Sequence, residues 1–285
     1  MIKLGFIGTG KVGSALAVLL SRRGYRVAAA SSKGLASAQS LAQMVTGCRA
    51  FATNQAVADA ADLVFITTPD DVIGKIAAAV KWRKGQYVIH CSGADSTSIL
   101  EPARQSGAIV GAFHPLQTFA GLKQAMENIP GSTFAVEAGE PLLTTLKKMA
   151  EAVKGQCIEL KASDKVVYHA AAVLACNYLI TLVKLSTDLW QSFSVPPSQA
   201  TQALLPLLRG TLNNIDTIGI PDCLTGPIAR GDTGTVRKHL DALQKVAPAI
   251  LSTYKELGLK TIPIALAKGR INANQAKELE AVLGA

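Results

Sequence analysis

The chain has 285 residues, of which 49% are hydrophobic and 17% are charged, and its formal net charge is +9. This composition is typical of a folded soluble protein and excludes a low-complexity chain, while the length predicts two domains. The five cysteines and four histidines are scattered without metal-ligand spacing, which predicts free thiols in a reducing cytoplasm and no metal site.

The positive charge is concentrated at the start of the chain. Residues 1–58 carry seven Lys and Arg residues and no Asp or Glu. Nucleic-acid binders also concentrate positive charge, but these basic residues are dispersed and have no aromatic stacking platform beside them. We therefore expect a small anionic molecule as the partner, and no nucleic acid.

Short apolar runs alternate with helical periodicity across the first half. Strands are predicted at 2–7, 25–30, 62–68, 86–91, 108–113, 132–137 and 156–160, and helices at 11–23, 35–45, 71–82 and 140–155. Strands that alternate with helices indicate βαβ units and a mostly parallel sheet. The fold class predicted here is α/β, a doubly wound Rossmann sheet.

After Lys161 the pattern becomes almost entirely helical, with breaks predicted at 194–199, 218–227 and 260–265. This change predicts a dinucleotide-binding domain at 1–161 and an all-helical domain at 162–285. The most apolar run, Tyr168–Val183, is interrupted by polar residues, so a buried helix is expected rather than a membrane span. The N-terminus shows no pattern of a secretion signal.

Residues 8–13 read GTGKVG between a predicted strand and a predicted helix. Gly8, Gly10 and Gly13 fit the fingerprint in which glycines allow a tight turn, close approach of the backbone to a pyrophosphate, and close packing of helix on strand. Lys11 and Val12 would begin the helix, whose free N–H groups and dipole favour an anion. A turn that merely needs glycine is the alternative.

The end of the second predicted strand indicates which dinucleotide binds. NAD sites usually place an Asp or Glu about 20 residues after the glycine loop, where it contacts the ribose hydroxyls. Here Ser31, Ser32 and Lys33 occupy that stretch, and the first acid is Asp59. Two hydroxyls and an ammonium suit the 2′-phosphate of NADP, with an exposed polar turn as the alternative.

Two further strand ends carry polar residues. Thr68 and Pro69 follow one strand, and Ser92 and Gly93 follow the next. Ligands of open α/β sheets bind outside the carboxyl ends of strands, so these four are predicted contacts of the nicotinamide side. The two acids that follow, Asp70 and Asp71, are expected to cap a helix.

Candidate catalytic residues lie further along. His114 ends a predicted strand, where its ring would face a substrate or would pack between the domains. Lys165 and His169 are one helical turn apart on a shared face, and a Lys on a nearly apolar helix needs a partner or a role unless it lies in solvent. Asn177 lies about 120° around the helix from Lys165, so it joins them only if the helix bends or a ligand spans the groove.

The loop 222–232 interrupts two helical patterns. Gly226 and Pro227 mark a turn, and the helix after it would present free N–H groups to an anion. Arg230 is able to hold a carboxylate in bidentate fashion, which predicts a substrate site with Thr225 and Gly226. An ion pair of Arg230 with Asp232, or a dimer contact, is the alternative.

These motifs together resemble the Rossmann-like NADP oxidoreductases with a carboxy-terminal helical domain of unknown function, relatives of ketopantoate reductase, pyrroline-5-carboxylate reductase and 6-phosphogluconate-type dehydrogenases. The likeness rests on GTGKVG, TTPDDVI, HCSGA, AFHPLQTF, YHAAAVLACNYL and LTGPIARGD. The 6-phosphogluconate-type relatives have an Asn one turn after the catalytic Lys. This chain has His169 at that place, so Asn177 is expected to take the polar role.

The resemblance implies hydride transfer from NADPH to a small carbonyl or imine substrate, a site between the domains, and a homodimer through the helical domain. A 2-oxo acid similar to ketopantoate is the first substrate expected, with Lys165 or His114 polarising the carbonyl and donating the proton. His169 and Asn177 would orient the substrate. The alternatives are a pyrroline-type imine reductase, a 3-hydroxyacid dehydrogenase, or a non-catalytic NADP sensor.

Overall fold

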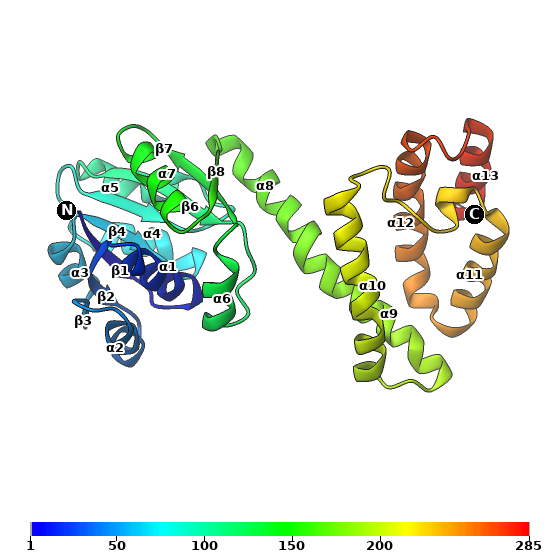
Figure 1. Cartoon of the computed structure of the whole chain (residues 1–285). Coiled ribbons are helices and arrows are strands. Elements are labelled where there is room, and N and C mark those ends of the chain that lie inside the picture. The colour runs from blue at the N-terminus through cyan, green and yellow to red at the C-terminus, as the bar shows by residue number, and fades with distance from the viewer. Residues whose placement is uncertain (1, 285) are drawn as a thin grey trace. The chain divides into compact units, whose positions relative to one another are not determined.

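The computed structural model describes residues 2–284, and its first half forms an α/β sheet with helices on both faces (Figure 1). The strands are β1 (Lys3–Ile7), β2 (Arg26–Ser31), β3 (Arg49–Phe51), β4 (Leu63–Ile66), β5 (Tyr87–His90), β6 (Ile109–Pro115), β7 (Thr133–Ala138) and β8 (Gln156–Glu159). Their order in the sheet is β3-β2-β1-β4-β5-β6-β7-β8. Neighbours are parallel except β6 and β7, which confirms the predicted mostly parallel sheet.

Helices and one 3-10 turn connect these strands. They are α1 (Lys11–Arg22), α2 (Leu35–Met44), α3 (Asn54–Ala60), α4 (Asp70–Ala79), η1 (Thr97–Leu100), α5 (Glu101–Gln105), α6 (Leu122–Asn128) and α7 (Leu142–Ala152). Each strand side chain points to the opposite face from its neighbour, so β4 sends Leu63 and Phe65 into one core, and Val64 and Ile66 into the other. The first core packs under α1, α2, α6 and α7, and the second under α3, α4 and α5.

The chain order of the strands reverses between β1 and β4. One half of the sheet continues outward through β2 and β3, and the other through β5 and β6. Because β1, β2, β4, β5 and β6 are parallel, their carboxyl ends lie at one edge. In open α/β sheets, the crevice outside this edge at the switch point is where ligands bind.

Four elements were missed by the sequence analysis. They are β3, α3, α5 and α6, with three to seven residues each. Such short elements complete too little of a period for a hydrophobic pattern to show. Because β3 and α3 were not predicted, the side chains where they meet were not recognised either. Thr53 and Asn54 among them line a cavity that also includes Gly8.

The second half of the chain is helical, as predicted. Its elements are η2 (Ala162–Asp164), α8 (Lys165–Ala172), the π-helical turn η3 (Val173–Asn177), α9 (Tyr178–Leu189), η4 (Trp190–Phe193), α10 (Pro197–Thr217), η5 (Ile228–Arg230), α11 (Thr233–Val246), α12 (Pro248–Ala267) and α13 (Ala273–Gly284). A third core lies among α11, α12 and α13, around Val236, Ile262 and Leu279.

The chain divides into two compact units, residues 1–176 and 177–285. The α/β elements end with β8 at Glu159, close to the boundary at Lys161 that the change of pattern predicts. The first unit nevertheless extends through α8, because this helix sends Lys165 into the carboxyl edge of the sheet. The domain boundary at 161 stays a prediction.

The helix predicted as buried is exposed in the single chain. Within Tyr168–Val183, Leu174, Tyr178 and Ile180 have exposed fractions of 64%, 53% and 66%. The helical stretch Ala162–Phe193 is long and apolar enough to cross a membrane, with a mean hydropathy of 1.8 in its most apolar window, and none of that window is buried. Length and composition of this kind are also found in core helices of soluble proteins. The expectation of burial is wrong for the chain by itself.

The break predicted at 260–265 is also wrong. Helix α12 continues through Pro263, as α10 continues through Pro206. A proline removes one N–H from a helix. In α12, Ile262 and Ala265 on either side of Pro263 are buried in the third core, and this packing offsets the lost hydrogen bond.

Candidate active site of the Rossmann unit

The loop between β1 and α1 is a turn that needs two of its glycines. Gly8 has a φ of +101°, and its N–H donates to the carbonyl of Ser31 at 2.8 Å. A Cβ on Gly13 would lie 2.2 Å from Oγ1 of Thr67 and 2.4 Å from the carbonyl oxygen of Gly8. The Thr67 hydroxyl donates to that same carbonyl at 2.6 Å, so helix and strand pack here without room for a side chain.

Gly10 is different, because nothing in the protein requires it to be glycine. A Cβ there would meet no atom within 4 Å, and its φ of −72° suits any residue. It precedes α1, whose first residue is the exposed Lys11, followed by the half-buried Val12. The first turn of α1 has no acid and no side-chain cap, so no side chain at this helix start accepts its first N–H groups. This is the arrangement that a pyrophosphate needs.

A cavity of about 410 Å³ lies beside this loop and brings together Gly8, Ser32, Lys33 and Thr68. Among the described residues, the buried hydroxyls of Thr9 and Thr68 have no hydrogen-bond partner. Buried polar atoms are nearly always paired, so these two unpaired hydroxyls, one after β1 and one after β4, suit a polar ligand. Thr53 and Asn54 also line this cavity, and the sequence analysis missed them together with β3 and α3.

Ser31 does not join the other two members of the predicted phosphate cluster. It ends β2, is 1% exposed, and its hydroxyl donates to Oδ1 of Asn54 at 2.8 Å. Ser32 is half-buried and Lys33 is exposed, and both reach the cavity just before α2. The Ser31 hydroxyl is therefore already used within the protein, whereas Ser32, just after the end of β2, reaches the cavity; contact of Ser31 with a cofactor stays a prediction.

The ends of β4 and β5 are tied together by hydrogen bonds. The Ser92 hydroxyl lies 2.9 Å from Oδ2 of Asp70 and 2.9 Å from Oδ2 of Asp95. Asp95 returns its backbone N–H to the same hydroxyl at 3.0 Å. Asp70 begins α4 after Pro69, which holds the N-cap position, so Asp70 binds the neighbouring loop rather than capping the helix as predicted.

Lys165 is buried at this edge. Only 1% of the residue is exposed, and Nζ donates to the carbonyl of Ser92 at 3.1 Å. Burial lowers the pKa of the Lys165 ammonium, and the nearby carboxylate of Glu137 opposes that change. Lys165 thus holds the loop after β5 from the first turn of α8.

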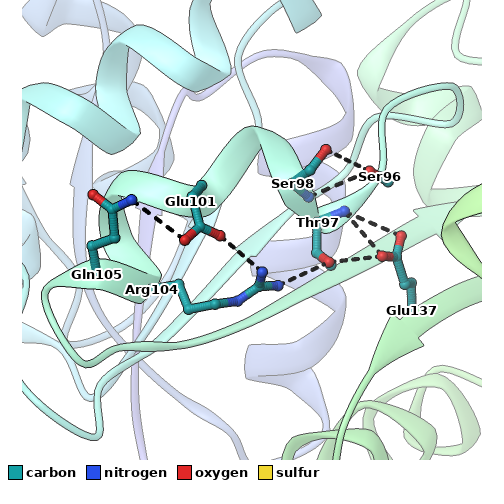
Figure 2. A network of polar contacts seen from close by, with 7 residues as sticks. All are labelled: Ser96, Thr97, Ser98, Glu101, Arg104, Gln105 and Glu137. Atoms are coloured by element: carbon teal, nitrogen blue, oxygen red, sulfur yellow. Dashed lines mark hydrogen bonds and ion pairs between the residues drawn. The ribbon is translucent and has the colours of Figure 1, made fainter.

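Glu137 anchors the far end of the same loop (Figure 2). It lies on β7 and accepts the backbone N–H of Thr97 at 3.1 Å and the Thr97 hydroxyl at 2.7 Å. Arg104 donates to that hydroxyl at 3.3 Å and pairs with Glu101 at 2.9 Å. Figure 2 shows these contacts in one continuous network. The loop from Ser92 to Thr97 is therefore held at both ends.

Three histidines gather beside this loop. His90 ends β5, is fully buried, and accepts the Ser92 N–H on Nδ1 at 3.1 Å. His114 on β6 is half-buried, and its Nδ1 lies 2.9 Å from the hydroxyl of Tyr168. Its ring also meets that of His169 edge-on, with centroids 6.2 Å apart. No motif in the sequence indicated a role for His90 or Tyr168.

The electrostatics of this cluster keep the imidazoles of His90 and His114 neutral. Burial, with the Lys165 charge as a smaller contribution, lowers the pKa of His90 to about 3 and that of His114 to about 4. Burial raises the pKa of Tyr168 to about 12. At neutral pH, the half-buried surface at the carboxyl edge therefore carries a neutral imidazole and a protonated phenol.

Four predicted site residues lie in the second unit. Asn177 ends the π-helical turn, Thr225 lines a cavity of about 230 Å³, Gly226 has a φ of +97°, and Arg230 is exposed. Their part in a site with the first unit stays a prediction.

The helix expected after Pro227 is only the three-residue η5, which offers no extended N-terminus to an anion. The longer helix that follows, α11, is capped by Asp232, which accepts the Thr235 N–H at 2.9 Å. Among the described residues, Arg230 forms no ion pair with Asp232. The N-terminus of α11 is thus already occupied by a carboxylate of the chain, that of Asp232.

Comparisons with known proteins agree with this architecture. Residues 1–115 match the family profile of a Rossmann-like domain, and no curated protein matches the sequence. A Bacteroides fragilis structure ascribed to an NADP oxidoreductase is 24% identical, covers 92% of this chain and 98% of its own, and has a TM-score of 0.74. The protein is thus of the class in which a Rossmann-like domain precedes a helical domain.

Residues 132–261, from just before β7 into α12, match a domain of unknown function, DUF2520. Matches to a Rossmann-like domain and to DUF2520 thus follow one another along the chain.

Two further structures share the fold. A reductive aminase of Aspergillus terreus in complex with NADPH and ethyl levulinate is 18% identical, with 99% of each chain covered and a TM-score of 0.66. A Plasmodium falciparum pyrroline carboxylate reductase with NADP bound is 15% identical, with 99% and 98% of the chains covered and a TM-score of 0.59. At these identities the likeness establishes the fold.

Proposed function

We propose that the protein is an NADPH-dependent oxidoreductase that reduces a small carbonyl substrate. The observation that carries this proposal is Gly10, a glycine that neither packing nor backbone geometry requires, at the start of an uncapped helix beside an open cavity. The fold of NADPH-bound reductases supports it. NADPH, when bound, would supply the hydride.

NADP is proposed over NAD because of the residues after β2. Ser32 and Lys33 line the cavity, and no acid precedes Asp59 to repel a 2′-phosphate. The helix that begins at Leu35 has no acid in its first turn and no side-chain cap, so its N–H groups add to the same positive field. Charge-assisted hydrogen bonds to a phosphate contribute about 1.5–3 kcal/mol each, so one is sufficient for a tenfold preference.

His114 is proposed as the group that polarises the carbonyl and donates the proton. It is half-buried at the carboxyl end of β6, whereas Lys165 is enclosed and already donates to Ser92. Lys165 would act as a positioning residue that holds the Ser92 loop and disfavours a charged imidazole beside it. His169, which is half-buried, is proposed to orient the substrate, and Asn177 is proposed as a second orienting residue.

A 2-oxo acid similar to ketopantoate is the proposed substrate, with its carboxylate held by Arg230, Thr225 and Gly226. A pyrroline-type or other imine is the second candidate, because the reductive aminase and pyrroline carboxylate reductases share this fold. His114 favours the carbonyl, because reduction of C=O requires a proton at oxygen and an iminium ion already carries one.

A second copy of the chain is the proposed cover for the exposed helices α8, α9 and α10. Exposed apolar patches of this kind mark interaction surfaces. The ion pair of Lys184 with Asp188 lies within the apolar stretch, and such charges are costly in a bilayer, which favours a protein over a membrane. A cytoplasmic homodimer is expected.

Sedimentation equilibrium tests this assembly. Ile180→Glu on α9 should give monomers, while Met44→Glu, which changes an exposed apolar residue of α2, should leave the dimer intact. A wild-type monomer would contradict the homodimer.

The activity is tested by a screen of 2-oxo acids, other ketones and cyclic imines with NADPH, followed by absorbance at the nicotinamide band. The wild-type protein should oxidise NADPH with a 2-oxo acid, and His114→Gln should lose about a hundredfold in kcat with NADPH binding unchanged. NADPH binding without turnover on any compound would instead support a sensor.

A further inference from the structure

We propose that Tyr168 is a positioning residue that sets the tautomer of His114 and relays a proton to it during reduction. This inference rests on the proposed function and deepens it. It assigns a role to a hydroxyl that the sequence analysis did not use. The two side chains come from different elements, β6 and α8, both within the first compact unit.

The geometry of the pair is that of a directed hydrogen bond. The Tyr168 hydroxyl lies 2.9 Å from Nδ1 of His114, and the rings meet edge-on at 88° with centroids 5.7 Å apart. A phenol is a good donor and a weak acceptor, because its oxygen lone pair is delocalised into the ring. Tyr168 therefore donates to a bare Nδ1, and the imidazole proton lies on Nε2.

The groups that face His114 keep it in this neutral form. From α8 they are Lys165, Tyr168 and His169, and from β5 the nearby titratable group is His90. Lys165 and His169 both oppose protonation of His114, and burial opposes it most. A neutral imidazole holds a single proton, so the partner of Nδ1 decides which nitrogen can donate.

Nε2 is the nitrogen that faces the loop after β5. A Cβ on Gly93 would lie 2.9 Å from Nε2, and the structure gives Nε2 no hydrogen-bond partner among the described residues. The donor end of the ring thus lies at the edge of the sheet where ligands of this fold bind, while its acceptor end is held by Tyr168.

The relay balances without a charged imidazole. The carbonyl carbon takes a hydride, and its oxygen takes the proton from Nε2 as the C=O double bond becomes a single bond. The Tyr168 hydroxyl proton passes to Nδ1, which leaves a phenolate that is less basic than an alkoxide. After the product leaves, Nδ1 returns its proton to the phenolate as Nε2 takes from bulk solvent the one proton that the reduction consumes.

The chain contains a matched control. In the second unit, Nδ1 of His239 lies 2.7 Å from the hydroxyl of Tyr254, with the rings edge-on at 83°. This pair has the same geometry and joins α11 to α12, away from the glycine loop in sequence and in a different compact unit. Tyr254→Phe thus removes an equivalent hydroxyl from a pair with no proposed role in catalysis.

The test is the ¹⁵N chemical shift of the His114 ring nitrogens in the full-length protein without cofactor or substrate. Wild type should show a protonated Nε2 and a bare Nδ1. Tyr168→Phe, which keeps the ring and removes only the hydroxyl, should give a mixture of tautomers. Tyr254→Phe should leave the His114 signals unchanged and alter those of His239.

This readout separates the inference from the proposed function, because it requires no turnover. Identical His114 tautomers in wild type and Tyr168→Phe would overturn the inference even in an active enzyme. With an active substrate, Tyr168→Phe should lower kcat about tenfold or more with KM within twofold. An unchanged kcat together with a shifted tautomer would overturn the relay.

Discussion

Gly93 and His114 face each other across the carboxyl ends of β5 and β6, so closely that a Cβ on residue 93 would lie 2.9 Å from Nε2 of His114. The same Cβ would lie 2.7 Å from Cδ2 of His169. The absence of a side chain at one position thus allows two imidazoles to lie over the loop. Residue 93 is glycine because its neighbours leave no room for a side chain. Its backbone conformation does not require glycine, since its φ is not in the left-handed region.

Gly93→Ala should therefore displace both rings and lower kcat about tenfold or more. The added methyl group should cost about 1–3 kcal/mol in the free energy of unfolding, as overpacking usually does. Gly139→Ala is the control, because a Cβ there meets no atom within 4 Å. Steady-state kinetics and urea denaturation measure the two effects, and equal kcat values for the two variants would contradict the prediction.

Gly10→Ala and Gly13→Ala should have opposite consequences. Gly10 has open space for a methyl group, so its variant should fold with a loss of at most about 1 kcal/mol from the helix cap, yet bind NADPH at least tenfold more weakly. Gly13 has none, so its variant should fail to fold stably. Calorimetry of binding and thermal unfolding distinguish them, and unimpaired NADPH binding by Gly10→Ala would argue against the phosphate site.

Lys33→Glu should reverse the preference between cofactors. Wild type is expected to bind NADPH at least tenfold tighter than NADH, a difference of about 1.4 kcal/mol. The variant places a negative charge in the cavity proposed to hold the 2′-phosphate. Lys148→Glu, on the exposed face of α7, makes the same change in net charge elsewhere and should leave the ratio unchanged. Fluorescence titration with both cofactors measures it, and equal affinities in wild type would refute the assignment.

Stability should fall as the pH drops from about 6.5 toward 4. In the folded protein, the pKa of His90 is lowered to about 3 and that of His114 to about 4, while unfolded histidine titrates near 6.5. In this window the unfolded chain binds protons that the folded chain does not, so each histidine lowers the free energy of unfolding by at most about 1.4 kcal/mol per pH unit.

His90→Asn should flatten that dependence, because the amide keeps an acceptor for the Ser92 N–H and does not titrate. The variant loses some stability at every pH, so the slope between pH 6.5 and 4.5 is the measured quantity. Urea denaturation across this range provides it. The same slope in both proteins would show that His90 titrates alike in the folded and unfolded states.

Arg230→Lys should raise KM for the oxo acid about tenfold and leave NADPH binding intact, because Lys lacks the planar fork that holds a carboxylate at two points. Arg230 is exposed, so folding should not change. Arg237→Lys, an exposed position of α11, is the control. A dimer that dissociates in the Arg230 variant would reassign the loop to assembly.

The sequence was sufficient to predict the elements that are long enough to show a hydrophobic period. The alternation of strand and helix patterns along the first half and the glycine spacing of residues 8–13 predict the parallel sheet and the phosphate loop without further information. The short β3 and α3 complete too little of a period to be recognised, and Thr53 and Asn54 of the cofactor cavity were missed with them. The prediction of a buried helix at Tyr168–Val183 failed because hydrophobicity indicates a need for cover and not what supplies it.

The sequence by itself determined which residue types stand at the carboxyl ends of the strands, because local hydrophobic patterns and turn residues predict the order of strand, loop and helix. Only the tertiary structure decided what those residues do. It enclosed Lys165 on the Ser92 carbonyl, turned Ser31 toward Asn54, and joined Tyr168 to His114 across 54 positions of chain. The direction in which a side chain points and the extent of its burial depend on the packing of elements distant in sequence. These two properties determine which ring nitrogen of a histidine holds a proton and which hydroxyl has no partner.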